Sequence, residues 1–175
     1  MRFSCPRSGS PCTRAMGAAV AVALIAVSSV PALAQRVADS PFAALQGSWA
    51  GSGTIAMSGG AKERIRCRAN YRLGSSSSNL RLGLSCEGDS YRFELESQIS
   101  YRDGKLSGTW GESTRATGGS IDGHAAGNQI QLRADGQTFT ALLSMTTRGD
   151  RQSVSIQSPG SEMSDVNIVL TRGSR

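Results

Sequence analysis

The sequence predicts an all-β domain in which about eight to ten antiparallel strands run up and down in succession and close into a barrel. Three observations support this fold class. From Gly47 onward apolar side chains recur at every second residue, which is typical of strands with one buried face, and no stretch keeps a helical period for three turns. Turn signals separate these runs at the spacing of β-hairpins. Glycines also fall inside several runs, where they permit the sharp bends of barrel corners.

A sheet of this many antiparallel strands must either close on itself or split in two to remove its exposed edges. Closure gives a barrel, whereas splitting gives a two-layer β-sandwich. Both architectures have the same alternation of apolar and polar residues, so the sandwich remains the alternative. Interior glycines such as Gly83 and Gly108 favour the barrel.

The N-terminus of the chain has the pattern of a secretory signal peptide. Arg2, Arg7 and Arg14 precede an apolar run over residues 18–27, and a Pro-Ala-Leu-Ala sequence ending at Ala34 supplies the cleavage site. The apolar run is shorter than the roughly 20 residues needed to cross a bilayer, so we expect no membrane-spanning segment. The protein is therefore predicted to be periplasmic or secreted, with residues 1–34 removed.

Removal of this leader changes the charge of the protein. The chain has 19 basic and 13 acidic residues and a net charge of +6, and the leader takes three arginines and no acidic residue with it, which leaves +3. That value is ordinary for a domain of this size, and the basic residues are not interleaved with stacking aromatics, so nucleic acid is not an expected partner. Residues 35–46 then form a lead-in, and residues 47–175 have the usual length of one domain.

The clearest strand covers residues 62–72. Ile65, Cys67, Ala69 and Tyr71 share one face of it, and arginines occupy most of the other. The same alternation recurs over residues 80–86, 91–99, 130–134 and 166–170. Turn signals lie between the runs at Gly59-Gly60, residues 74–78, Gly88-Asp89, Asp103-Gly104, Asp135-Gly136 and Gly149-Asp150. The two Asp-Gly pairs predict tight type I′ turns, because both residues tolerate positive φ.

Two cysteines, Cys67 and Cys86, remain after the leader is removed. In an oxidising compartment an even pair predicts one disulfide, and two buried, reduced thiols are the alternative. If the two cysteines face each other, Tyr71 faces Leu82 and Arg66 faces Glu87, but Arg72 faces Arg81, which is unfavourable. The bond would contribute about 3 kcal/mol by closing a loop in the unfolded chain. Because the spacing is not Cys-x-x-Cys, we expect a structural role.

Residues 42–49, Phe-Ala-Ala-Leu-Gln-Gly-Ser-Trp, resemble the start of the first strand in the calycin barrels, the lipocalins and avidins. This resemblance implies that Trp49 lies across one end of the barrel. It also implies that Arg172, from the last strand, packs on the indole as a cation over an aromatic face.

The chain also resembles a group of small secreted proteobacterial proteins of unknown function. Besides the Gly-x-Trp of the first strand, the shared features are Arg66-Cys67-Arg68, Ser107-Gly108-Thr109-Trp110 and the Val-x-Ile-x-Leu over residues 166–170. This resemblance implies the barrel and the exported location, and it implies no activity.

The sequence offers few groups for catalysis or metal binding. His124 is the only histidine and lies in a glycine-flanked stretch, which favours a solvated histidine over a metal ligand. The chain has no Gly-x-Ser-x-Gly elbow around a nucleophilic serine. Glu94 and Glu96 share the polar face of one strand, where we expect them to accompany arginines. We therefore expect no enzyme, no catalytic residue, no metal and no cofactor.

Two surfaces are candidates for binding. Arg64, Arg66 and Arg68 form an outward face that could bind phosphates or carboxylates, and the alternative is a solvated face neutralised by Glu87 and Asp89. Inward aromatics could line a cavity or fill a solid core, and small inward residues such as Ala69 and Ser97 favour some space. The possible cavity-lining aromatics are Tyr71, Tyr91, Phe93, Trp110 and Phe139.

The sequence thus predicts an exported, non-enzymatic binding protein whose ligand is a small apolar molecule or an anionic component of the cell envelope. The alternative is a protein-binding module, such as a periplasmic inhibitor of a protease or lysozyme. An inhibitor of this kind would use a protruding segment, and residues 35–40 and 157–164 are the places to expect one.

Overall fold

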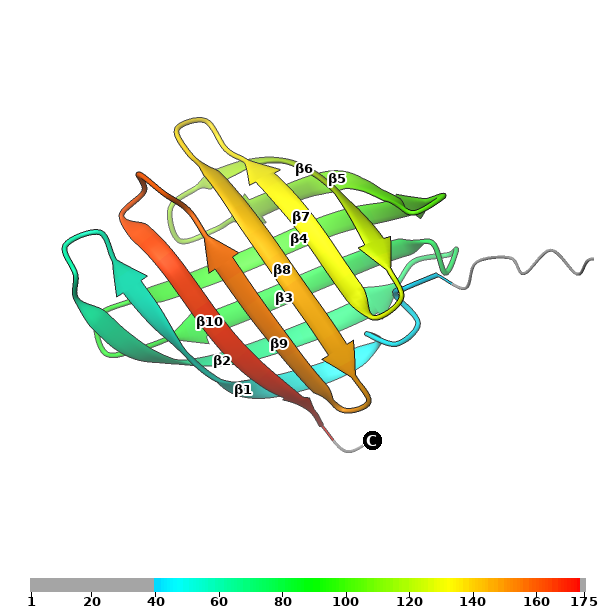
Figure 1. The fold of residues 1–175 in the computed structure, drawn as a ribbon, viewed down its shortest axis with the longest axis horizontal. Helices are drawn as coiled ribbons and strands as arrows, with labels where there is room; N and C mark the ends of the chain where they lie inside the picture. The colour runs from blue at the N-terminus through cyan, green and yellow to red at the C-terminus, as the bar shows by residue number, and fades with distance from the viewer. Residues whose placement is uncertain (1–39, 174–175) are drawn as a thin grey trace, which may run out of the picture. The chain divides into compact units, whose positions relative to one another are not determined.

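The computed structural model describes residues 40–173, so the leader predicted over residues 1–34 lies outside the described residues. Ten strands make up the described chain, joined by short turns (Figure 1). They are β1 (Gly47–Met57), β2 (Lys62–Leu73), β3 (Asn79–Glu87), β4 (Arg92–Arg102), β5 (Lys105–Glu112), β6 (Thr117–Ala126), β7 (Gln129–Asp135), β8 (Thr140–Arg148), β9 (Arg151–Gln157) and β10 (Met163–Arg172). Among residues 40–173 there is no helix long and apolar enough to cross a membrane.

The strands form a closed barrel and not a two-layer sandwich. Each strand pairs antiparallel with its neighbours in the chain, and β1 pairs with β10 to complete the ring. This closing pair runs from Trp49 opposite Arg172 to Met57 opposite Met163, with one irregularity next to Met57. The ring therefore has no free edge strand, as an up-and-down barrel requires.

The predicted alternation of faces is clearest in β2. Ile65, Cys67, Ala69 and Tyr71 are buried inside the barrel, whereas Arg64, Arg66, Arg68 and Arg72 are exposed outside. Inward residues of the other strands continue the same core. The period-two pattern thus predicted both the strand and the side of it that is buried.

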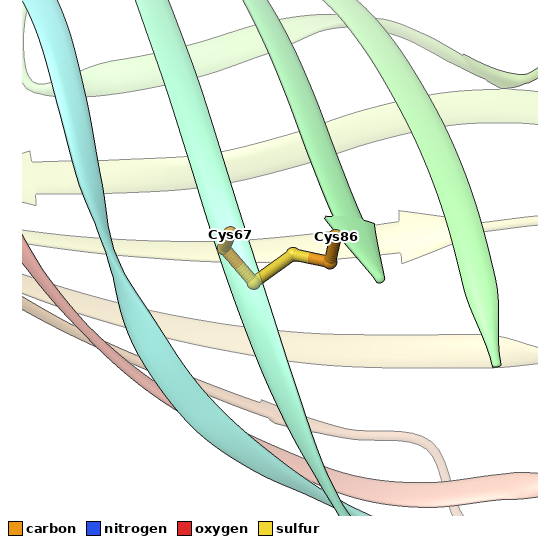
Figure 2. The surroundings of a disulfide bond; sticks show 2 residues. All are labelled: Cys67 and Cys86. Atoms are coloured by element: carbon orange, nitrogen blue, oxygen red, sulfur yellow. A yellow bond between two sulfur atoms is a disulfide. The ribbon is translucent and has the colours of Figure 1, made fainter. Parts of the chain in front are cut away.

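The predicted disulfide fixes the register of β2 against β3. Cys67 lies opposite Cys86, their Cα atoms are 4.1 Å apart, and their sulfurs are bonded (Figure 2). The pairs that follow from this register are those predicted from the sequence, including Tyr71 with Leu82 and the unfavourable Arg72 with Arg81. Both cysteines are buried, so the bond lies in the core beneath the arginine face.

Inward glycines lie where the sheet turns its corners. A Cβ added to Gly51 in β1 would collide with the carbonyl oxygen of Val169 in β10, and one at Gly108 in β5 would collide with that of Gln98 in β4. At these positions neighbouring backbones approach too closely for any side chain. β7–β10 consequently pass in front of β2–β4 and cross them at a steep angle (Figure 1).

One of the two predicted Asp-Gly turns is a tight turn and the other is wider. Asp103 and Gly104 have φ of 49° and 82°, as a type I′ turn requires. At Asp135-Gly136 the loop instead covers residues 136–139 and is closed by a 2.9 Å bond from the Gly136 amide to the Phe139 carbonyl. The prediction of a type I′ turn centred on Asp135-Gly136 was wrong, because neither residue has positive φ, and Phe139 at the end of the loop packs on Trp110.

Changing Cys67 to Ser should lower the free energy of unfolding by about 3 kcal/mol, because the unfolded chain regains the freedom of a loop with a sequence separation of 19. Urea unfolding measures the loss. Wild-type protein unfolded under reducing conditions is the control and should show the same loss. Equal stability of the variant and the oxidised wild type would contradict this role.

Candidate functional site

One end of the barrel, here called the floor, is closed by Trp49 and Arg172. The guanidinium of Arg172 lies 4.3 Å from the centroid of the indole, and the Trp49 ring packs edge-on against Tyr71. The indole N–H donates to the Leu45 carbonyl at 2.7 Å. Trp49 is 1% exposed, so this cation–aromatic contact seals the floor from solvent.

The lead-in before β1 belongs to this floor. Residues 41–45 form a turn that buries Phe42 and Leu45 to 1% and 2% exposure. Arg172 donates to the carbonyls of Ala44 and Gln46 and pairs with Asp150 at 3.1 Å. The last strand thereby clamps the segment that precedes the first.

Above this floor the barrel encloses an apolar void of about 50 Å³. Its wall is made of inward leucine, isoleucine, valine and methionine side chains together with Phe42 and Tyr71. Several inward residues, including Leu82, Leu84, Leu132, Leu143 and Ile156, stay only partly buried although they point into the barrel. Ten strands make a wider ring than the eight that side chains just fill, which leaves this space.

The void has one polar neighbour, the hydroxyl of Tyr71. It donates to Gln152 Oε1 at 2.7 Å, and Gln152 Nε2 donates to Thr147 Oγ1 at 3.1 Å. Burial raises the pKa of Tyr71 far above its ordinary value, although the Gln152 bond opposes this. The phenol therefore stays neutral, and its hydrogen bond is directed to the wall and away from the void.

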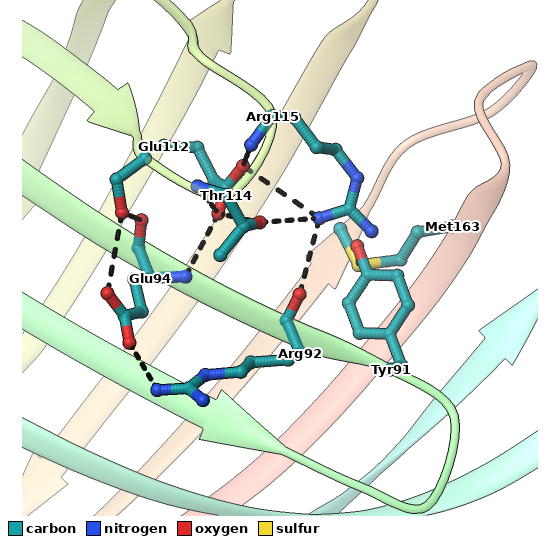
Figure 3. Close-up of polar contacts among 8 residues, drawn as sticks. Tyr91, Arg92, Glu94, Glu112, Thr114, Arg115 and Met163 are labelled. Carbon is teal, nitrogen blue, oxygen red and sulfur yellow. Dashed lines mark hydrogen bonds and ion pairs between the residues drawn. The ribbon is translucent and has the colours of Figure 1, made fainter.

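The end opposite the floor, here called the mouth, is covered on one side by Tyr91 and Phe93. Their rings lie 6.0 Å apart, and the Tyr91 hydroxyl reaches Met163 Sδ across the opening at 3.6 Å. Arg115, from the β5–β6 turn, stacks on the Tyr91 ring at 4.6 Å (Figure 3). Burial raises the pKa of Tyr91 and the charge of Arg115 opposes it. Tyr91 thus lies between Arg115 and Met163 as a cover.

Glu112 holds the turn that carries Arg115. Its carboxylate accepts hydrogen bonds from the Glu94 amide at 3.0 Å and from the hydroxyl and amide of Thr114, and it also accepts one from the Arg115 amide at 2.8 Å (Figure 3). Burial raises the pKa of Glu112, but these hydrogen bonds outweigh burial and hold the pKa below its ordinary 4.5. The ionised Glu112 side chain therefore holds the turn that places Arg115 on the Tyr91 ring.

The other side of the mouth is covered by Trp110 and Phe139, whose ring centroids are 5.5 Å apart. Trp110 Nε1 donates to the Asp135 carbonyl at 3.4 Å. A side chain at Gly136 would press on both rings, so glycine is needed in this loop. Of the five aromatics considered as cavity lining, Tyr71 lies in the wall of the void and the other four close the mouth.

The arginine face predicted from the sequence lies on the outer wall. Arg64, Arg66 and Arg68 are exposed side by side on β2. Ion pairs within residues 40–173 involve Arg92, Arg115, Arg133 and Arg172. The expected neutralisation by Glu87 and Asp89 is therefore not made by direct pairs among the described residues.

The remaining candidates are also outside the barrel. Glu94 pairs with Arg92 at 2.7 Å, as expected, whereas Glu96 makes no ion pair among residues 40–173. His124 is exposed near the end of β6, opposite Gln131 and Lys105. In the β9–β10 turn Ser158 is 1% exposed and its hydroxyl donates to the Thr140 carbonyl of β8 at 3.1 Å, so this turn is attached to the barrel rim.

The roles of Phe42, Arg115 and Glu112 are not predicted from the sequence. A signal for the first was present, since Phe42 and Leu45 are apolar residues three apart just before Gly47. Arg115 and Glu112 lie in a polar turn, and only the closed ring brings them to Tyr91.

Comparisons with known proteins bear on the fold. No protein-family description and no curated protein sequence matches this chain. Among solved structures, Rv2717c from M. tuberculosis is similar with a TM-score of 0.62 and 18% identity over 75% of this chain and 94% of that chain. The S-type phycobiliprotein lyase CpeS from Guillardia theta is similar with a TM-score of 0.56 and 10% identity over 77% and 91%. Together with the closed ring, they support a calycin-like barrel.

Changing Phe42 to Ala should destabilise the protein by about 3 to 5 kcal/mol, because it removes a ring that is 1% exposed and opens a cavity at the floor. Chemical unfolding measures the loss. Gln46→Ala, on the exposed end of the same segment, is the control and should change stability little. A loss for Phe42→Ala no larger than that of the control would contradict the role of the lead-in in the core.

Changing Glu112 to Gln should lower stability at pH 7 by about 1 to 3 kcal/mol, because the amide accepts through one oxygen and leaves donors unpaired. The pKa of Glu112 is lowered on folding, so its contribution is complete above pH 4.5 and disappears as the pH falls through the lower, folded value. Urea unfolding across this range should show the gap between wild type and variant closing in acid.

The matched control for this prediction is Glu87→Gln, an exposed carboxylate on β3. The free energy of unfolding of Glu87→Gln should stay close to that of the wild type over the same pH range. A gap for Glu112→Gln that persists unchanged in acid would show that its charge is not the source of the stability.

Proposed function

We propose that this protein is an exported, non-enzymatic binding protein that takes a small apolar molecule into the barrel. The apolar void above the floor is the observation that supports this proposal. Its wall presents leucine, isoleucine, valine and methionine side chains, and its one hydroxyl belongs to a neutral Tyr71 already bonded to Gln152. Such a wall offers a ligand burial and dispersion contacts, and no acid, base or nucleophile.

Size limits the ligand. Drug-sized ligands occupy roughly 300 Å³ or more, whereas the void holds about 50 Å³. Binding must therefore enlarge the void by moving wall residues, such as the partly buried Leu84 and Leu143 and the buried but flexible Met145. The mouth is the route of access, because Tyr91 is half-buried there and its ring is covered by the side chains of Arg115 and Met163.

The exported location rests on the leader pattern and on the Cys67–Cys86 disulfide, which is compatible with an oxidising compartment. The resemblance to small secreted proteobacterial proteins supports the same location through Arg66-Cys67-Arg68 and the residues around Trp110. The inhibitor alternative gains no support from the β9–β10 turn, because this turn is attached to the barrel rim.

Native mass spectrometry of the protein taken from its own cell envelope tests both parts of the proposal. Export predicts the mass of a chain that begins at Gln35. Binding predicts the additional mass of a small molecule, which is lost on denaturation. A chain that retains residues 1–34 would contradict export.

A series of n-alkanols from butanol to decanol tests binding directly, followed by methyl NMR of the inward leucines. Each added methylene should tighten binding about fourfold until the void is full, because burying one methylene contributes about 0.8 kcal/mol of binding free energy. Leu132→Phe fills the void and should abolish uptake, whereas Leu142→Phe on the exposed side of β8 should not. No binding by any alkanol, or equal binding by both variants, would contradict the proposal.

A further inference from the structure

The outer wall over β2, β3, β4 and β5 has a hollow of about 610 Å³. Outward positions of neighbouring strands form its base in one cross-strand row, Asn70, Gly83, Glu96 and Gly111. Arg72 and Arg81 border this row on one side. An adjoining hollow of about 850 Å³ shares the same row and adds Arg68.

The two glycines in the row are not required by the fold. A Cβ at Gly83 would have nothing within 4 Å, and one at Gly111 would meet only the Thr117 carbonyl at 4.0 Å. Neither residue has positive φ, unlike the turn glycines. Glycine weakens a strand, and it is common where a ligand approaches the backbone closely. The missing side chains at Gly83 and Gly111 leave the hollow open, although neighbouring atoms would leave room for a side chain at either position.

Arg72 and Arg81 are directly opposite each other and both are exposed. Like charges at such a pair are unfavourable. No carboxylate of residues 40–173 lies within ion-pair distance of either side chain, since the ion pairs there belong to other arginines. An anion between the two guanidiniums would relieve this repulsion and accept bidentate hydrogen bonds from each.

The other groups around Gly83 narrow the class of anion. Asn70 uses one amide hydrogen on Ser48 and has a second hydrogen to donate. Glu96 borders the hollow from β4 and makes no ion pair among the described residues. A carboxylate at that place repels a bare anion but accepts from a hydroxyl or ammonium group.

We propose that this hollow binds a phosphate ester, with its phosphate between Arg72 and Arg81 and a hydroxyl or ammonium group of the same molecule on Glu96. A free phosphate ester and a phospholipid headgroup have this chemistry in common. The residues assigned to this site are outward positions of their strands, and the proposal does not depend on what the void in the barrel binds.

The probes are O-phosphoethanolamine and inorganic phosphate, followed by the amide NMR signals of Gly83 and Gly111 at low salt. Both signals should shift on titration, and O-phosphoethanolamine should bind more tightly than phosphate. Arg72→Ala and Arg81→Ala should each weaken binding at least about tenfold, because each removes a charge-assisted bidentate contact.

Arg64→Ala is the matched control, since Arg64 has the same charge and exposure on the same face of β2 but lies eight residues from Arg72, roughly 26 Å along the strand. It should leave the affinity unchanged within about twofold. Equal weakening by Arg64→Ala and Arg72→Ala would overturn the proposal in favour of diffuse attraction to a basic surface. The absence of any shift with either probe would overturn it as well.

Two further variants separate binding from folding. Gly83→Val fills the hollow with a residue that suits a strand, so it should abolish binding while the unfolding midpoint stays the same or rises. Glu96→Gln should reduce the preference for O-phosphoethanolamine over phosphate at least about fivefold. Retained binding in Gly83→Val, or an unchanged preference in Glu96→Gln, would contradict the proposed placement.

Vesicles identify the source of the phosphate. Phosphatidylcholine vesicles with and without phosphatidylethanolamine are sedimented with the wild type and with Arg72→Ala. Wild-type binding that requires phosphatidylethanolamine and is lost in Arg72→Ala supports a lipid headgroup. Binding of soluble O-phosphoethanolamine alone supports a free phosphate ester.

Discussion

Pairing of the first strand with the last is the interaction on which the rest of this structure depends. β1 joins β10 over most of its length, from Trp49 opposite Arg172 to Ile55 opposite Val166 and beyond. Without that ladder the sheet would have two free edges and no interior, because each remaining pair of strands is a local hairpin. The same pairing delivers Arg172 to the floor, where it stacks on Trp49 and holds the carbonyls of the lead-in. Closure of the sheet and sealing of one end are thus performed by the same strand.

The closed ring separates two chemical environments that alternate along every strand. Inside, the wall is apolar and its few polar groups are bonded to one another, as in the chain from Tyr71 through Gln152 to Thr147. Outside, β2 carries arginines that make no ion pairs among residues 40–173, and glycines open hollows beside them. A single residue step along β2, from buried Tyr71 to exposed Arg72, passes from one environment to the other. The apolar side chains of the inner wall and the charged side chains of the outer wall therefore face opposite sides of the same strand.

The sequence predicted the features that depend on local pattern. Alternation gave the faces of β2, the two cysteines gave its register against β3, and Asp103-Gly104 gave a tight turn. The sequence did not predict features that need three or more segments to meet. The alternation over residues 91–99 predicts Tyr91 as an inward aromatic, but its position at the mouth depends on Arg115 from one turn and Met163 from β10. Phe139 likewise packs on Trp110, which lies in a different hairpin. Such contacts are set by the closed ring and leave no periodic trace in the chain.

Closure between β1 and β10 also constrains how the chain reaches its native state. The partners of this ladder are separated by almost the entire domain, so the loop-closure entropy of the ring must be overcome after the local hairpins have formed. A growing chain cannot finish the barrel until residue 172 is available, and until then β1 and the most recent strand both present unpaired backbone. The same property makes the last strand the point of greatest vulnerability, because loss of β10 would leave β1 and β9 as open edges able to pair with other chains.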